Sequence, residues 1–120
     1  MGVFMEIGYV VVAAVLAVAL VGSAFGKLTR SRQVVDSLTG VGVPLKLFPA
    51  LAACEIAGAA GLVVGIWWPP LGIAGAIGVV LYFVLAVGQH LRKKDFKGMP
   101  PAGTLLVLAV VALVLRLVSL

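Results

Sequence analysis

Residues 45–68, LKLFPALAACEIAGAAGLVVGIWW, decide the fold, because this stretch is long enough and apolar enough to cross a bilayer. It carries one carboxylate, Glu55, well inside the apolar run. At a helical rise of about 1.5 Å per residue, Glu55 is expected roughly 14 Å beyond Lys46, near the middle of a hydrocarbon layer about 30 Å thick. An ionisable side chain at that depth is costly and normally faces a bundle interior or a wet cavity.

The rest of the chain is similarly apolar. Of its 120 residues, 63% are hydrophobic and 11% are charged, and the mean hydropathy is +1.27. These polar groups are too few to cover the surface of a water-soluble domain. The composition therefore predicts an all-α integral membrane protein with one domain, residues 1–120. The pI near 9.9 does not indicate a nucleic-acid partner, because the basic residues lie beside apolar segments and form no basic face with aromatic side chains.

Four apolar runs predict a bundle of four membrane-spanning helices joined by short connectors. The expected spans are about residues 5–26, 46–67, 71–90 and 102–118. In the first connector, Val34, Val35 and Leu38 fall at helical spacing, which fits a short interfacial helix ended by Gly40 in the left-handed conformation. A simple loop fits this connector equally well.

The basic residues predict the orientation of the bundle. Eight of the nine Lys and Arg residues flank the first and third connectors, and Arg116 alone lies on the other side. The positive-inside rule therefore predicts cytoplasmic basic connectors and both termini outside, in a multi-pass protein of the bacterial plasma membrane. Arg116 is expected to snorkel or to pair with Glu6.

Small residues predict the faces at which the helices meet, because close backbone approach drives helix association in lipid. The expected faces are Gly8, Ala19, Gly22 and Gly26 in the first span, Cys54, Gly58, Gly61 and Gly65 in the second, and Gly72, Gly75, Ala86 and His90 in the third. The alternative is that glycine is simply frequent in membrane helices. Cys54 is expected to be buried, protonated and inert.

Five polar side chains are candidates for ligand binding or proton transfer: Glu55, Tyr82, His90, Gln89 and Lys27. Glu55 is either a proton carrier or ligand contact, or a structural carboxyl bonded to a neighbouring helix, and Tyr82 can reach it near mid-membrane. His90, with Gln89 beside it, can relay protons, bind a headgroup or cap its helix. Lys27 is expected to be an anchor, because an axial gap of roughly 14 Å separates it from Glu55.

Several kinds of chemistry lack the residues they need. One cysteine and one histidine exclude an intramolecular disulfide, a His/Cys metal cluster and a bis-His haem site within one chain. The sequence has no catalytic triad, no Gly-rich phosphate loop and no metal-ligand spacing, so neither catalytic residues nor a metal are expected. A non-enzymatic role is favoured, and a bound quinone is the one cofactor left open.

The order of several motifs resembles the bacterial DoxX-like family over nearly the whole chain. The motifs are Gly26-Lys27-Leu28, Gly42-Val43-Pro44, Glu55-x-x-Gly58-Ala59-x-Gly61-Leu62-x-x-Gly65-x-Trp67-x-Pro69, residues 86–90 and a Pro that opens the last span. The resemblance implies a four-helix membrane bundle in which Lys27, Glu55 and His90 match the family's polar positions. Some relatives are linked to membrane oxidoreductase assemblies and to thiol or superoxide stress, and a eukaryotic branch is similar to a receptor-assembly chaperone. This chain lacks a cysteine pair and a recognisable cofactor site, so redox work would need a partner or a quinone.

Three functions are compatible with these residues. The first is a non-enzymatic bundle that binds a lipophilic small molecule or a membrane protein partner, a second copy included, around Glu55, as an accessory to an oxidoreductase assembly. The second is a proton-coupled exporter similar to the small multidrug resistance family, whose acid, however, lies in the first span. The third is a quinone-linked oxidoreductase subunit in which His90 or Glu55 bonds a quinone carbonyl. Membrane lipid is an expected partner in all three.

Overall fold

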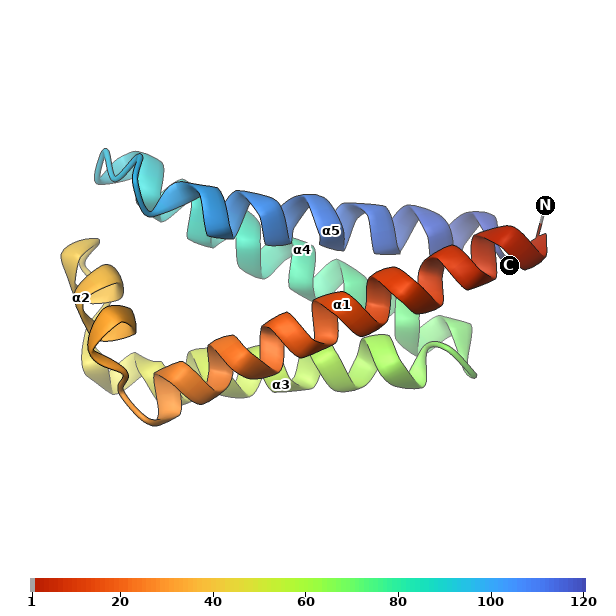
Figure 1. The fold of residues 1–120 in the computed structure, drawn as a ribbon, viewed down its shortest axis with the longest axis horizontal. Coiled ribbons are helices and arrows are strands. Elements are labelled where there is room, and N and C mark those ends of the chain that lie inside the picture. Colours follow the sequence, from red (N-terminus) through yellow and green to blue (C-terminus); the bar gives the residue numbers. More distant parts are fainter. Residues whose placement is uncertain (1) are drawn as a thin grey trace.

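A computed structural model describes residues 2–120, and this part of the chain is helical throughout apart from short connectors (Figure 1). The elements are α1 (Gly2–Leu28), α2 (Arg32–Gly40), the 3-10 helix η1 (Leu45–Leu47), α3 (Phe48–Val64), α4 (Pro69–Arg92) and α5 (Met99–Val118). Four segments are long and apolar enough to cross a membrane: α1, η1 with α3, α4 and α5. The predicted all-α membrane bundle of four helices is therefore confirmed.

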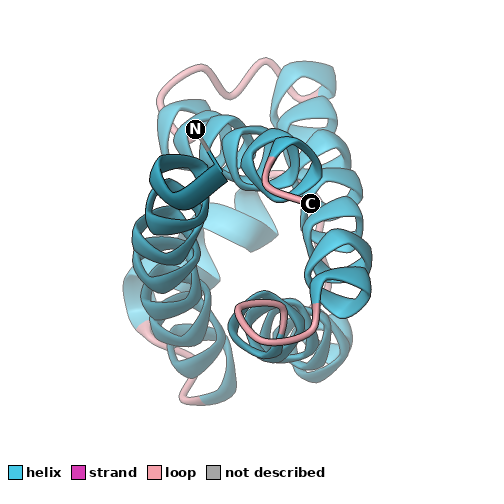
Figure 2. Cartoon of the chain, turned by 90° about the vertical axis from the view of Figure 1, so that its right-hand side faces the viewer, coloured by secondary structure: helices cyan, strands magenta, loops and turns pink. Residues whose placement is uncertain are grey.

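The four long helices form a ring (Figure 2). α1 packs against α3 and α5, and α4 packs against the same two helices from the opposite side. Both termini lie at one end of the bundle, while α2 and the α4–α5 connector lie at the other end (Figure 1). The basic connectors thus share one end, as the sequence predicts, and the side of the membrane on which they lie stays a prediction.

Prolines set where three of the helices begin. α3, α4 and α5 each carry a proline in the first two positions, where the missing N–H leaves no hydrogen bond unmade. The helix bounds lie within a few residues of the predicted spans at most ends. The second span differs most, because α3 ends at Val64 and the exposed Trp67 and Trp68 lie at the turn before α4.

The first connector contains a helix, which decides between the two readings of residues 28–44. α2 is amphipathic, and Val34, Val35 and Leu38 are half-buried while none of its residues is fully buried. The prediction that Gly40 ends this helix in the left-handed conformation is wrong. Gly40 is still helical, and the positive φ of 85° occurs two residues later, at Gly42.

Glycines bring α3 and α4 into backbone contact. A Cβ placed on Gly61 would lie 3.1 Å from the Cα of Gly75, and a Cβ on Gly65 would overlap the backbone of Gly72. The predicted contact faces of the second and third spans are therefore confirmed at these four positions. Tyr9 of α1 closes the contact from inside by donating a hydrogen bond of 2.7 Å to the carbonyl oxygen of Leu62.

The predicted contact face of the first span is wrong at Gly22, whereas a Cβ on Gly8 would lie 3.5 Å from Leu115 of α5 and one on Gly26 would lie 3.0 Å from Val34 of α2. Gly22 is exposed, and a Cβ added to it would meet no atom within 4 Å. The buried face of α1 consists of Tyr9, Ala13, Leu16, Ala17, Leu20, Ala24 and Lys27. Cys54 is likewise exposed at the bundle surface, contrary to expectation. Because α1 is apolar all the way round, its hydrophobic residues do not reveal which side faces the bundle.

Arg116 is buried at the end of the bundle that holds the termini. Its Nη2 lies 3.6 Å from Glu6 Oε1, which confirms the expected pairing. The alternative expectation, that Arg116 snorkels toward the membrane surface, is wrong, because only 2% of Arg116 is exposed. Its Nη1 instead donates a hydrogen bond of 3.2 Å to the carbonyl oxygen of Gly65, and its guanidinium lies 4.8 Å from the centre of the Tyr9 ring.

Candidate functional site

The centre of the site is a buried ion pair between α1 and α3. Lys27 Nζ lies 2.6 Å from Glu55 Oε1, and the two side chains are 8% and 0% exposed. Lys27 also donates a hydrogen bond of 2.8 Å to Ser23 Oγ, one helical turn earlier in α1. The expectation that Lys27 is an anchor too distant to pair with Glu55 is therefore wrong.

The direction of helix side chains explains how the two charges meet. Side chains on a helix lean toward its N-terminus, so a long one can bridge an axial gap between two backbones. From the last turn of α1, the long Lys27 stem therefore carries its ammonium back into the bundle toward Ser23 and Glu55.

The Glu55 carboxylate keeps unused capacity to accept hydrogen bonds. Lys27 occupies Oε1 at 2.6 Å, whereas among residues 2–120 no donor makes a hydrogen bond to Oε2. Buried polar oxygens normally have partners, because leaving them without one costs free energy. A buried carboxylate with a free acceptor is thus the feature that most strongly indicates a binding site for a hydrogen-bond donor.

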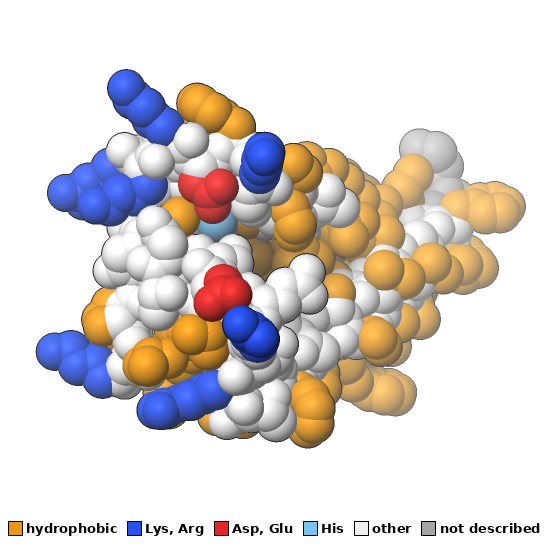
Figure 3. All heavy atoms as spheres, turned by 60° about the vertical axis from the view of Figure 1, so that its left-hand side comes forward, with side chains coloured by type: hydrophobic (Ala, Val, Ile, Leu, Met, Phe, Trp, Pro, Cys, Tyr) orange, Lys and Arg blue, Asp and Glu red, His pale blue; other side chains and the backbone are white. Residues whose placement is uncertain are grey.

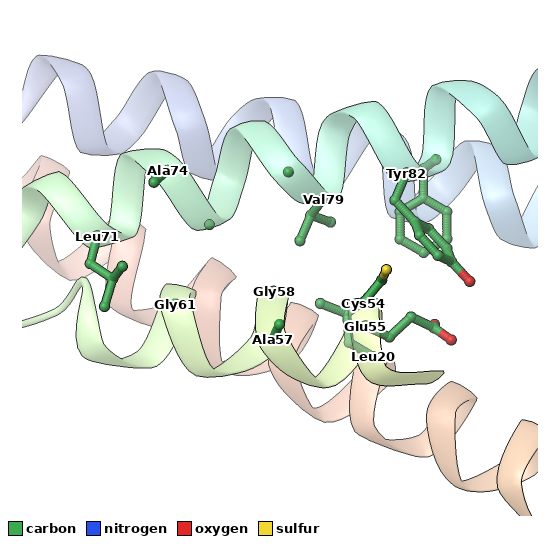
Figure 4. A pocket seen from close by; sticks show the side chains of 13 residues that line it. Leu20, Cys54, Glu55, Ala57, Gly58, Gly61, Leu71, Ala74, Val79 and Tyr82 are labelled. Atoms are coloured by element: carbon green, nitrogen blue, oxygen red, sulfur yellow. The ribbon is translucent and has the colours of Figure 1, made fainter. Parts of the chain in front are cut away.

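An apolar cavity of about 390 Å³ lies next to this carboxylate, between α3 and α4 (Figure 4). Most of its lining consists of small and aliphatic residues: Leu20, Cys54, Ala57, Gly58, Gly61, Leu71, Ala74, Gly75, Gly78, Val79 and Phe83. Glu55 and Tyr82 lie at one end, and the Tyr82 hydroxyl points toward the carboxylate (Figure 4). We call this space the inner cavity.

A second, more polar cavity of about 870 Å³ lies at the basic end of the bundle, and we call it the vestibule. Its lining includes Lys27, His90, Asp95 and residues of α2. Tyr82 and Phe83 line both cavities, so these two rings stand between them.

The structure thus divides the five predicted site residues among three places. Lys27, Glu55 and Tyr82 come together between the two cavities. His90 is buried beside the vestibule, where its Nδ1 lies 2.9 Å from Asp95 Oδ2. Gln89 lines neither cavity; its Nε2 donates a hydrogen bond of 2.5 Å to the carbonyl oxygen of Val41 and so fastens α4 to the first connector.

Sequence reasoning missed Ser23 and Asp95. Ser23 lies four residues before Lys27, the spacing that places two side chains on one helix face. Asp95 is the only acid in the connector that follows His90, and it also accepts a hydrogen bond of 3.1 Å from the Gly98 amide through Oδ1. Both signals were present in the sequence, but each depends on knowing which way a neighbouring side chain points.

We expect the stability conferred by Asp95 to depend on pH. The hydrogen bond from His90 and the bond from the Gly98 amide lower the pKa of Asp95 below its ordinary value of 3.8. The stabilisation of the fold by ionised Asp95 is therefore fully present above pH 3.8 and is lost as the pH falls through the lowered pKa. Thermal unfolding of wild-type protein and Asp95→Asn should differ at about pH 6, and the difference should shrink below pH 3.8. A difference that stays constant down to about pH 2 would contradict this.

The model of a family described as the DoxX-like family matches residues 11–112. No curated protein and no solved structure matches the chain. The matched range contains Lys27, Glu55, Tyr82 and His90, and so covers the ion pair and both cavities.

Proposed function

Since the chain belongs to the DoxX-like family of membrane proteins, we propose that it is a non-enzymatic binding protein that holds a lipophilic small molecule in its inner cavity. The observation that carries this proposal is an apolar cavity that ends at a buried, incompletely bonded carboxylate. Ligand sites in proteins typically combine an apolar lining with a few polar groups that fix orientation. Glu55 and Tyr82 supply those groups here.

The position of the inner cavity supports access from the bilayer. Cys54 and Ala57 of α3 and Ala74 and Gly78 of α4 line the cavity and are also exposed on the outer surface of the bundle. In a membrane this surface faces lipid, so a molecule dissolved in the hydrocarbon layer can reach the cavity sideways, without crossing the aqueous phase.

The polar end of the cavity favours a ligand with one hydrogen-bond donor. The Glu55 oxygens have accepting capacity left, and a hydroxyl or N–H group on the ligand would use it. Bonds to a charged acceptor are stronger than bonds between neutral groups. The apolar body of the ligand would then lie along the glycine-rich surfaces of α3 and α4.

The ion pair bears on the two other functions. An exporter that binds a lipophilic cation at Glu55 would first have to displace the Lys27 ammonium from the carboxylate. A quinone carbonyl only accepts hydrogen bonds, so it would use Tyr82 or Lys27 as its donor and leave the free Glu55 oxygen unused. The geometry therefore supports binding of a donor-bearing lipophile best.

The cellular setting follows from the membrane fold and the charge distribution. Four spanning helices make the chain a multi-pass membrane protein. We place it in the bacterial plasma membrane, with the vestibule on the cytoplasmic side and both termini outside, because the basic residues flank the connectors at the vestibule end. In this setting it would hold its lipophile for a membrane partner, such as an oxidoreductase assembly.

The proposal is tested by filling the cavity without breaking the fold. A Cβ added to Gly78 meets no atom within 4 Å, although Gly78 lines the cavity, so Gly78→Phe should block the site and leave the helices in place. Gly88 is equally open but lies outside both cavities on the same helix, which makes Gly88→Phe the matched control. Lipophilic molecules extracted from the purified proteins are then quantified by mass spectrometry.

We expect wild-type protein and Gly88→Phe to retain the same molecule in near-equal amounts, and Gly78→Phe to retain at least about tenfold less, since a filled pocket loses the contacts that hold the ligand. Equal retention by all three proteins, or no specific molecule in any of them, would contradict the proposal.

A further inference from the structure

The vestibule is a basic hollow at the end of the bundle that holds the connectors (Figure 3). Figure 3 shows Lys and Arg side chains around this end, with acidic side chains at the edge of the hollow. The charged residues of its lining are four lysines and two aspartates: Lys27, Lys93, Lys94, Lys97, Asp36 and Asp95. Lys27 is paired with Glu55, and the three remaining lysines still outnumber the two aspartates.

Two nitrogen-bearing side chains stand deep in this hollow. Lys27 and His90 both line the vestibule, and each is more than nine-tenths buried. His90 Nδ1 donates to Asp95, so its Nε2 is a hydrogen-bond donor only in the imidazolium form. Asp95 is itself occupied by His90 and by the Gly98 amide, so this acid is already satisfied within the protein. Lys27 is held by Glu55, so the rim lysines Lys93, Lys94 and Lys97, which form no ion pair among residues 2–120, are the groups placed to receive an anion.

One wall of the vestibule is a helix of the interfacial type. α2 supplies Gln33, Val34, Asp36, Ser37, Leu38 and Gly40 to the lining, yet none of its residues is buried. A short amphipathic helix beside membrane-spanning helices lies at the depth of the lipid headgroups. Opposite it, Ala86, Ala102 and Leu105 give the vestibule an apolar side. In a phospholipid, the phosphate can contact the lysines and the carbon chains can contact this apolar side. Free phosphate would leave the apolar side without a contact.

Basic residues also occupy two backbone positions that normally belong to glycine. α1 and α4 both end in Schellman turns, with Ser31 N–H bonded to the Gly26 carbonyl and Asp95 N–H bonded to the His90 carbonyl. The left-handed residues in these turns are Arg30 and Lys94, with φ of 52° and 55°. A side chain in this conformation costs free energy, so placing Lys94 at the vestibule rim has a price in stability that a charge requirement would explain.

From these observations we infer that the vestibule binds the headgroup of an anionic phospholipid. The phosphate lies among the rim lysines, above His90, and the glycerol and upper acyl carbons lie against Ala86, Ala102 and Leu105. Basic pockets between membrane helices bind anionic headgroups in this way. The site is separate from the inner cavity, so it stands or falls independently of the lipophile proposed there.

The inference is tested by native mass spectrometry of the full chain in detergent with dioleoyl phosphatidylglycerol or dioleoyl phosphatidylcholine. We expect the anionic lipid to bind at least about tenfold more tightly than the zwitterionic one. Each rim lysine should contribute about fivefold, so Lys94→Gln with Lys97→Gln should remove most of the preference. Lys46→Gln with Arg92→Gln removes the same charge at the same end from residues that do not line the vestibule, and should change affinity less than about twofold.

Three results would overturn the inference. Equal affinity for the two lipids would exclude an anion site, and an equal loss in both double variants would mean that general surface charge attracts the lipid. Competition by glycerol 3-phosphate at the same concentrations as the lipid would assign the vestibule to soluble phosphates. As an added check, Lys94→Gly should bind the anionic lipid more weakly while unfolding at the same temperature as wild type or higher, because glycine relieves the left-handed backbone.

Discussion

Lys27→Met is expected to lower the free energy of unfolding by about 3–5 kcal/mol, because it leaves the Glu55 carboxylate buried without its counterion. The methionine keeps nearly the length of the lysine stem, so the loss comes from charge and not from packing. The measurement is unfolding of the purified protein in mixed micelles of increasing denaturing detergent. Lys46→Met, which removes an exposed lysine from the same end of the bundle, should change the free energy by no more than about 0.5 kcal/mol.

The double variant Lys27→Met/Glu55→Leu distinguishes the loss of the whole ion pair from the burial of one unpaired charge. Removing both charges leaves no uncompensated ion, and apolar replacements of buried pairs are often neutral or stabilising. We therefore expect the double variant to recover most of the stability that Lys27→Met loses. If Lys27→Met alone unfolds like wild type, the two side chains are not paired inside the bundle.

Gly65→Ala is expected to lower the free energy of unfolding by about 3 kcal/mol or to prevent folding, because the added methyl group would overlap the backbone of Gly72. The backbone of Gly65 is itself in an ordinary helical conformation, so the cost arises from the closeness of the helices. The Tyr9 hydroxyl lies on the same side, which leaves the methyl group no free direction. The measurement is again denaturing-detergent unfolding, or yield of folded protein.

Gly88→Ala serves as the control for this contact. Gly88 lies in α4 as Gly72 does, but a Cβ there meets no atom within 4 Å. We expect stability to stay level or to rise by up to about 1 kcal/mol, since alanine is the better helix former. Similar behaviour of Gly65→Ala and Gly88→Ala would mean that α3 and α4 are not in backbone contact.

The sequence was sufficient for the membrane fold, because hydropathy and proline positions mark membrane helices directly. It also indicated Gly61, Gly65, Gly72 and Gly75 correctly, since these glycines concentrate on one face of each of two consecutive helices. The rotation of α1 could not be predicted. Lipid-facing and bundle-facing positions are equally apolar there, so Gly22 looked like a contact residue although it is exposed.

The ion pair was missed for a different reason. Both of its residues are candidates from the sequence, but residue spacing gives only the axial separation of their backbones. The length and backward lean of the Lys27 side chain decide whether the charges meet, and residue spacing does not show them. For Arg116 the sequence indicated the pairing with Glu6 but not the burial, because a guanidinium is buried only where carbonyl and aromatic partners such as Gly65 and Tyr9 are in place.

The most direct test of the account is a density map of the protein in lipid nanodiscs at a resolution that shows side chains. We predict that Lys27 Nζ contacts Glu55, at a distance close to the 2.6 Å of this structure. We also predict non-protein density between α3 and α4 beside the carboxylate. A Glu55 carboxyl that faces water or lipid tails, or a space closed by protein side chains, would contradict it.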